Sequence, residues 1–131
     1  MPPSSAALAR RYGTDSVTTA SPARLVVMLY DRLLRDLRTA GAALQDRQVE
    51  ASHRALIHAQ EVLAELSSGL DLTIWPEGES LARLYVYLQE QLVQANVHKD
   101  PARVATCLEI VEPLREAWSE ALLASALTAA P

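Results

Sequence analysis

The chain has 131 residues, a formal net charge of −4 and a single cysteine. A chain of this length is expected to form one domain, residues 1–131, that is large enough to bury a hydrophobic core. The negative charge argues against a nucleic-acid partner, since nucleic-acid-binding proteins carry clustered basic charge. Because Cys107 has no second cysteine to pair with, the sequence excludes an internal disulfide and favours a reducing compartment.

No apolar run approaches the roughly 20 residues that span a bilayer, and the N-terminal residues lack a signal-peptide pattern. We therefore predict a cytoplasmic protein without membrane insertion. Half of the residues are hydrophobic and only four are glycine, while alanine and leucine are abundant. This composition favours an all-α fold.

The first 20 residues contain two prolines and a short apolar and basic segment that ends at Gly13. We predict that residues 1–20 form a mobile N-terminal arm, with at most a short cap helix. The first long helix is expected from Ser21 to about Leu44, because Ser21 can cap it and Pro22 suits its first position. Its predicted core stripe consists of Val26, Tyr30, Leu33, Leu37, Ala40 and Leu44.

Three further helices are expected at roughly 48–69, 79–97 and 101–123. Gly69 is placed to close the second helix, and residues 71–78 form a loop that contains a Trp-Pro pair. Pro113 lies inside the last helix, where it points outward and either bends or breaks the helix. Residues 124–131 are expected to be a frayed tail. Four helices of similar length with short links predict an antiparallel up-and-down four-helix bundle.

The third expected helix carries two apolar stripes. The second stripe consists of Ala82, Val86, Val93 and Val97, and valine is not a residue that helix propensity favours on an exposed face. Either this helix contacts two neighbours through a wide buried arc, or the stripe borders a groove for an amphipathic helix of another chain. The two interpretations are compatible. From the helical faces we predict partner contacts at Val62, Val86, Val93, Val97, Ile110 and Ala117.

The sequence lacks a phosphate-binding glycine loop, a paired-cysteine metal site and a histidine-glutamate zinc motif. His53 and His58 are five residues apart and so lie on different faces of one helix, which disfavours a shared metal. We predict no catalytic residue, no metal site and no cofactor. Histidine phosphotransfer stays open as an alternative, because His58 faces away from the core and Arg54 lies one turn before it.

Four groups of residues occur in an order that is specific when the groups are taken together. They are Tyr12, Thr19-Ala20-Ser21-Pro22, Leu25 and Met28-Leu29-Tyr30-Asp31; Ala59-Gln60, Leu63, Glu65-Leu66 and Ser68-Gly69-Leu70-Asp71; Gly78-Glu79, Leu84-Tyr85, Tyr87-Leu88, Leu92, Ala95-Asn96 and Asp100; and Leu114-Arg115-Glu116-Ala117-Trp118. Over about residues 12–120 the chain resembles the flagellar secretion chaperones for flagellin, a family of flagellar export chaperones.

The resemblance implies a small helical bundle, not an enzyme, that holds the C-terminal segment of flagellin in the cytoplasm. It implies that the protein prevents premature polymerisation and helps to deliver flagellin to the flagellar type III export gate. It also implies an N-terminal segment that packs on the bundle and moves when the client binds. We expect Leu8 and Tyr12 to form this cap over the apolar start of the first helix. The residues alone leave open a general helical adaptor for another secreted or regulatory protein.

The chain departs from the family pattern at several positions. Gln89, Glu90 and Gln91 stand where the resemblance leads us to expect basic residues, so the electrostatics of client binding are expected to differ. Val86 stands where aspartate is common, which strengthens the second apolar stripe. Arg32 replaces a glycine that commonly follows the Tyr-Asp pair.

Overall fold

The computed structural model describes residues 22–73 and 76–128. Within these ranges the chain forms helices and no strand. The elements are α2 (Pro22–Gln45), α3 (Val49–Ser68), the short 3-10 helix η1 (Pro76–Gly78), α4 (Glu79–His98) and α5 (Pro101–Thr128). The predicted starts of the four long helices are confirmed to within a residue. The predicted N-terminal arm, with Leu8 and Tyr12, lies outside the described residues.

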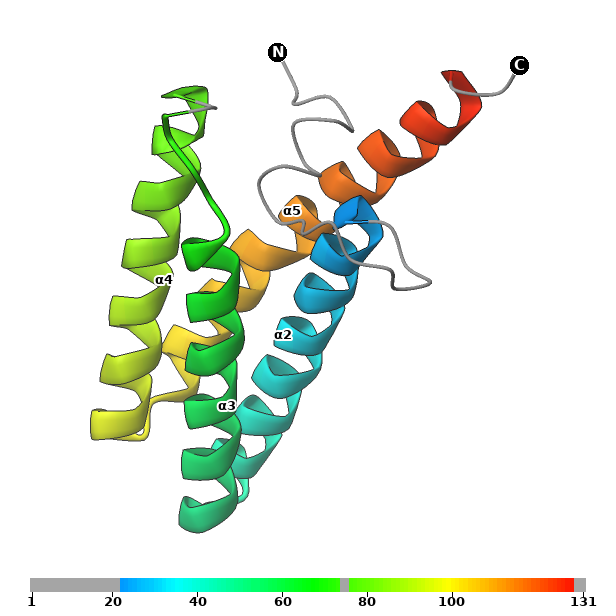
Figure 1. The fold of residues 1–131 in the computed structure, drawn as a ribbon. Coiled ribbons are helices and arrows are strands. Elements are labelled where there is room, and N and C mark those ends of the chain that lie inside the picture. The colour runs from blue at the N-terminus through cyan, green and yellow to red at the C-terminus, as the bar shows by residue number, and fades with distance from the viewer. Residues whose placement is uncertain (1–21, 74–75, 129–131) are drawn as a thin grey trace.

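The four long helices form an antiparallel up-and-down bundle, as Figure 1 shows. α2 packs on α3 and α5, and α4 packs on the same two helices from the other side. α2 and α4 therefore lie diagonally opposite each other. This arrangement confirms the predicted all-α four-helix bundle. None of the described helices combines the length and the apolar character needed to cross a membrane.

The core sits between the faces that the helical periodicity predicts. All six residues of the predicted stripe on α2 are buried, and so are Leu56, Ala59, Leu63 and Leu66 on α3. The hydroxyl groups of Tyr30 and Tyr85 are hydrogen-bonded to each other in the middle of this core. Because Tyr30 belongs to α2 and Tyr85 to α4, this contact joins the two diagonal helices and helps to fix their register.

α5 continues to Thr128, whereas the sequence predicted an end near Leu123 and a frayed tail. The added residues are mostly alanine and leucine, which are among the best helix formers. Figure 1 shows the C-terminal part of α5 extending past the start of α2. Pro113 is exposed and lies within the continuous helix, so the predicted outward orientation is confirmed and a break at this point is excluded.

The exposed Pro113 offers a test of how much strain α5 carries. Replacement Pro113→Ala restores a backbone hydrogen bond and removes a ring that clashes with the preceding turn. We expect the free energy of unfolding to rise by about 1–2 kcal/mol, since the gain in helix propensity exceeds the lost stiffness of the unfolded chain. Urea unfolding measures this change.

Glu109→Ala, one turn earlier at another exposed position, is the matched control for Pro113→Ala. It should change the free energy of unfolding by no more than about 0.5 kcal/mol. A Pro113→Ala variant that is less stable than the parent would show instead that the packing of α5 depends on the proline.

Candidate partner-binding groove

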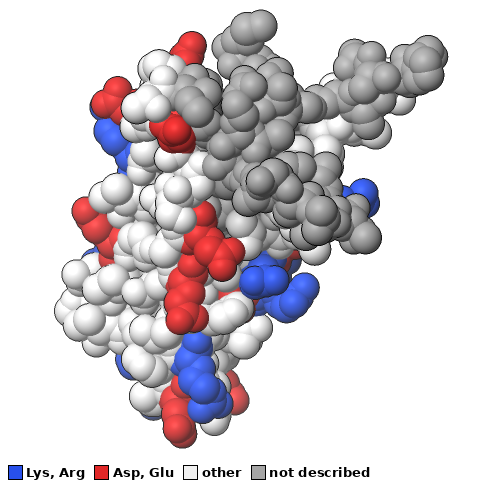
Figure 2. All heavy atoms as spheres, in the orientation of Figure 1, with Lys and Arg blue, Asp and Glu red and all other residues white. Residues whose placement is uncertain are grey.

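α3 and α4 border an open groove with a volume of about 550 Å³. The residues that line it are Ala64, Ser67 and Ser68 on α3, and Tyr85, Val86, Gln89, Glu90, Val93 and Gln94 on α4. The side chains contributed by α3 are small and do not fill the space opposite the valines of α4. In Figure 2 a largely uncharged area lies over α4 and the adjoining edge of α3, and acidic side chains border it.

The walls of the groove are apolar and exposed. The exposed fractions of Val86 and Val93 are 56% and 43%, and Val97, with 67%, continues the same stripe toward the end of α4. Ile57 is 39% exposed and lies two turns before Ala64 on the same face of α3. These valines therefore do not belong to a wide buried arc. The second stripe borders an open groove instead.

Two polar side chains that line the groove, Tyr85 and Gln89, form hydrogen bonds that connect α4 to α2 and α3. Tyr85 lines the groove while its hydroxyl group is bonded to that of Tyr30 in the core. The side-chain Nε2 of Gln89 donates a hydrogen bond to the backbone carbonyl of Gln60, with a distance of 2.9 Å. This bond ties α4 to α3 beneath the exposed valines. A partner helix would thus meet a surface that is already positioned.

The remaining predicted contacts lie elsewhere. Val62 is only 3% exposed, because it shares the flank of α3 that carries the buried Ala55 and Leu66, and this corrects its assignment to the groove. Ile110 is half-buried against the core, and Ala117 is exposed on α5. Neither residue lines the α3–α4 groove. Of the six predicted contacts, the structure brings only Val86 and Val93 together in the groove.

Sequence reasoning missed the α3 side of the groove. Ala64 is too small, and Ser67 and Ser68 are too small and polar, to stand out as candidate contacts. A signal was nevertheless present, since Ile57, Ala64 and Ser68 share one side of a helix and lie away from its core stripe. That side could be linked to Val86 and Val93 only by knowing which flank of the second long helix faces the third.

The three histidines make polar contacts at the surface, and the cysteine is buried. His58 Nδ1 lies 2.5 Å from an Asp36 carboxylate oxygen of α2, and the Asn96 side-chain amide nitrogen lies 3.0 Å from His53 Nδ1. Among the residues that the structure describes, no three His, Cys, Asp or Glu side chains are grouped to hold a metal ion. Burial raises the pKa of the Cys107 thiol to about 12, so the thiol stays protonated and unreactive near neutral pH.

These features define a class of protein, namely a four-helix bundle with an exposed apolar groove between two of its helices. The comparisons with known proteins then identify its family. The model of the family described as "Flagellar protein FliS" matches residues 4–125, and the chain belongs to this family of flagellar secretion chaperones. This result confirms the resemblance seen in the sequence, and the family is one of chaperones rather than enzymes.

Two relatives illustrate the relationship. The chain is 34% identical over 111 residues to the flagellar secretion chaperone FliS of Bacillus subtilis (strain 168). The matched region covers 85% of this chain and 83% of the relative. It is 29% identical over 122 residues to the flagellar secretion chaperone FliS of Escherichia coli (strain K12). This second match covers 89% of this chain and 88% of the relative. Both similarities extend over most of each chain.

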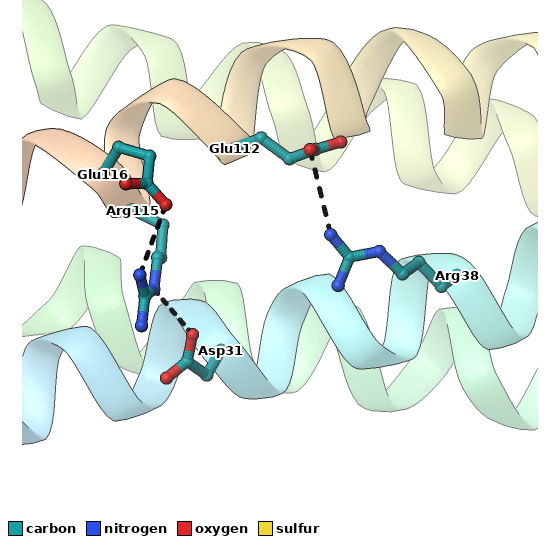
Figure 3. A network of polar contacts seen from close by, with 5 residues as sticks. All are labelled: Asp31, Arg38, Glu112, Arg115 and Glu116. Atoms are coloured by element: carbon teal, nitrogen blue, oxygen red, sulfur yellow. Dashed lines mark hydrogen bonds and ion pairs between the residues drawn. The ribbon is translucent and has the colours of Figure 1, made fainter.

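Charged residues connect α2 to α5 near Pro113, as Figure 3 shows. The Nε of Arg115 donates a hydrogen bond of 2.8 Å to Asp31, and its Nη1 lies 3.3 Å from Glu116. Arg38 and Glu112 form a second, longer ion pair of 3.8 Å. The hydrogen bond to Asp31 raises the pKa of Arg115, which keeps its charge at every accessible pH. Partly exposed pairs of this kind contribute about 0–1 kcal/mol each, so they orient the helices more than they stabilise them.

These contacts give structural roles to residues that carry the resemblance. Tyr30 and Asp31 belong to the first quoted group, and each contacts a residue of a later group. Tyr30 is bonded to Tyr85, and Asp31 is bonded to Arg115, 84 positions further along the chain. Neither Tyr30 nor Asp31 lines the groove. This part of the motif therefore holds the bundle together without itself lining the candidate binding surface.

Proposed function

We propose that this protein binds the disordered C-terminal segment of flagellin in the cytoplasm, prevents its premature polymerisation and assists its delivery to the flagellar type III export gate. Membership of the flagellar secretion chaperone family supports a secreted flagellar client. The observation that carries the choice of surface is the exposure of Val86 and Val93 within the α3–α4 groove. An amphipathic helix from the client would cover both valines.

The physical basis is the mutual covering of two apolar surfaces. A segment that folds only on binding exposes its apolar side chains when it is free, and those side chains promote association with other copies. Val86 and Val93 are seven residues apart, which is two helical turns or about 10 Å. This spacing matches apolar residues at positions i and i+7 of a client helix, as in other complexes in which a helix lies in a groove. Ordering the client costs several kcal/mol, which favours an affinity that permits release.

Titration calorimetry of the full chain with a peptide of the flagellin C-terminal segment tests the proposal. We expect 1:1 binding and a negative heat-capacity change, because apolar surface becomes buried. A peptide with the same composition in scrambled order is the control, since it keeps the charge and loses the apolar stripe. If neither peptide binds, or if both bind equally, flagellin is not the client recognised by this surface.

A further inference from the structure

We infer that Glu90 makes the α3–α4 groove selective for a client helix with a lysine or arginine one turn away from the apolar residue that covers Val86. A helix with a carboxylate at that position is rejected. The inference rests on the proposed function, because it concerns the same groove and the same client. It adds a charge requirement that the two exposed valines do not impose.

Glu90 is the only charged side chain among the described residues that line the groove. It is exposed on α4, four residues after Val86 and three residues before Val93. By the rise of an α-helix, it lies about 6 Å along the axis from Val86 and about 4.5 Å from Val93. A client helix that covers both valines therefore also passes the carboxylate of Glu90.

No cation of this chain is placed to neutralise Glu90. The residues three and four positions away from it along α4 are all uncharged, namely Val86, Tyr87, Val93 and Gln94. Residues 55–68 of α3 and 84–98 of α4 contain no lysine or arginine, and Lys99 lines a separate hollow. Within the described part of the chain Glu90 has no cationic partner within 4.0 Å. A positive charge opposite Glu90 has to come from another chain.

The arginines of α3 and α4 already have carboxylate partners. Arg54 is paired with Glu50 at 3.7 Å, and Arg83 is paired with Glu79 at 3.6 Å. In each pair the glutamate lies four residues before the arginine, which is the spacing that stabilises an exposed helix. Glu90 has no such role within α4, so its charge is available to a client.

A bound helix changes the surroundings of this carboxylate. Glu90 is exposed in the free protein, and a helix that lies over the valines removes part of its water, which disfavours binding unless a cation compensates. Lysine and arginine suit this position, because their aliphatic stems can cover the valines while their charged ends reach the carboxylate. A client carboxylate at the same position is repelled, so Glu90 also excludes unsuitable helices. The requirement is the same for both directions of the bound helix, since the cation is one turn from the apolar residue in either case.

Binding of the flagellin C-terminal peptide to Glu90 variants of the full chain tests the charge. Glutamine and lysine have helix propensities close to that of glutamate, and the position is exposed, so the variants should fold like the parent. We expect Glu90→Gln to weaken binding by about 2- to 5-fold and Glu90→Lys by about 5- to 20-fold at low salt, and both differences to shrink as salt is added. Titration calorimetry measures the affinities. Affinities equal to or above that of the parent at low salt overturn the inference.

Glu109→Lys is the matched control for Glu90→Lys. Glu109 is exposed on α5, which lies diagonally opposite α3, and it does not line the groove. This variant changes the net charge by the same amount and should bind the peptide like the parent. If it weakens binding as much as Glu90→Lys does, the effect arises from the overall charge of the protein, and the inference is wrong.

A second set of measurements locates the cation of the client. Each lysine and arginine of the peptide is replaced in turn by glutamine, and each peptide is titrated into the parent and into Glu90→Gln. We expect one replacement to weaken binding to the parent by about 2- to 5-fold and to have little further effect on the variant. If no replacement shows this coupling, the inference is overturned and the proposed function stands. Absence of binding between the unmodified peptide and the parent is the result that rejects the proposed function itself.

Discussion

Val93→Asp is expected to lower the affinity for the flagellin C-terminal peptide by at least about 30-fold while the bundle stays folded. Val93 lines the groove and is 43% exposed, so the free protein can hydrate an aspartate at this position. A bound apolar helix would remove the water from that carboxylate, and we expect a cost of at least about 2 kcal/mol. Titration calorimetry measures the affinity, and circular dichroism checks the fold.

Thr39→Asp is the matched control for this prediction. Threonine has nearly the same shape as valine, Thr39 is exposed in the C-terminal half of α2, and α2 lies diagonally across the bundle from α4. This variant introduces the same charge far from the groove and should bind the peptide like the parent. If Val93→Asp also binds like the parent, the client does not occupy the α3–α4 groove.

The second large effect is expected on stability. Leu63 is fully buried on α3, and Leu63→Ala leaves a cavity in the centre of the core. We expect the free energy of unfolding to fall by about 2–5 kcal/mol, from the lost burial and the unfilled space together. Urea unfolding followed by circular dichroism measures this loss. A loss below about 1 kcal/mol would show that the core collapses around the smaller side chain.

Val97→Ala serves as the control for Leu63→Ala, because it also shortens an aliphatic side chain. Val97 is 67% exposed, so its truncation should change the free energy of unfolding by no more than about 0.5 kcal/mol. Leu63→Ala also shows whether a loss of stability by itself reduces client binding. Leu63→Ala should weaken client binding only under conditions in which part of the protein is unfolded.

The helices and their core faces could be predicted from the sequence because helical periodicity is a local property. Tyr30 and Leu37 follow the spacing of one helix face, and both are fully buried. Pro22 and Pro101 suit the first position of a helix, and α2 and α5 begin at these residues. The end of α5 was harder to predict, because an alanine-rich segment carries no stop signal before Thr128.

The groove could be predicted only in part. Val86 and Val93 stand out as apolar residues away from the core stripe, and the structure leaves both exposed. The partner side of α3 was assigned to Val62, which is buried, instead of to Ala64 and Ser68. Periodicity tells which residues share a face of one helix, but it does not tell which neighbouring helix each flank meets.

By itself, the sequence determined the four helices, their buried stripes and a surplus of apolar residues on the third long helix, because these features depend on spacing within a segment. It also carried the order of residues that identifies the family. Only the tertiary structure decided which of the surplus residues remain exposed. It did so because the exposure of Val86 and Val93 depends on the small side chains that α3 places opposite them, and on the contacts that hold α4 to its two neighbours.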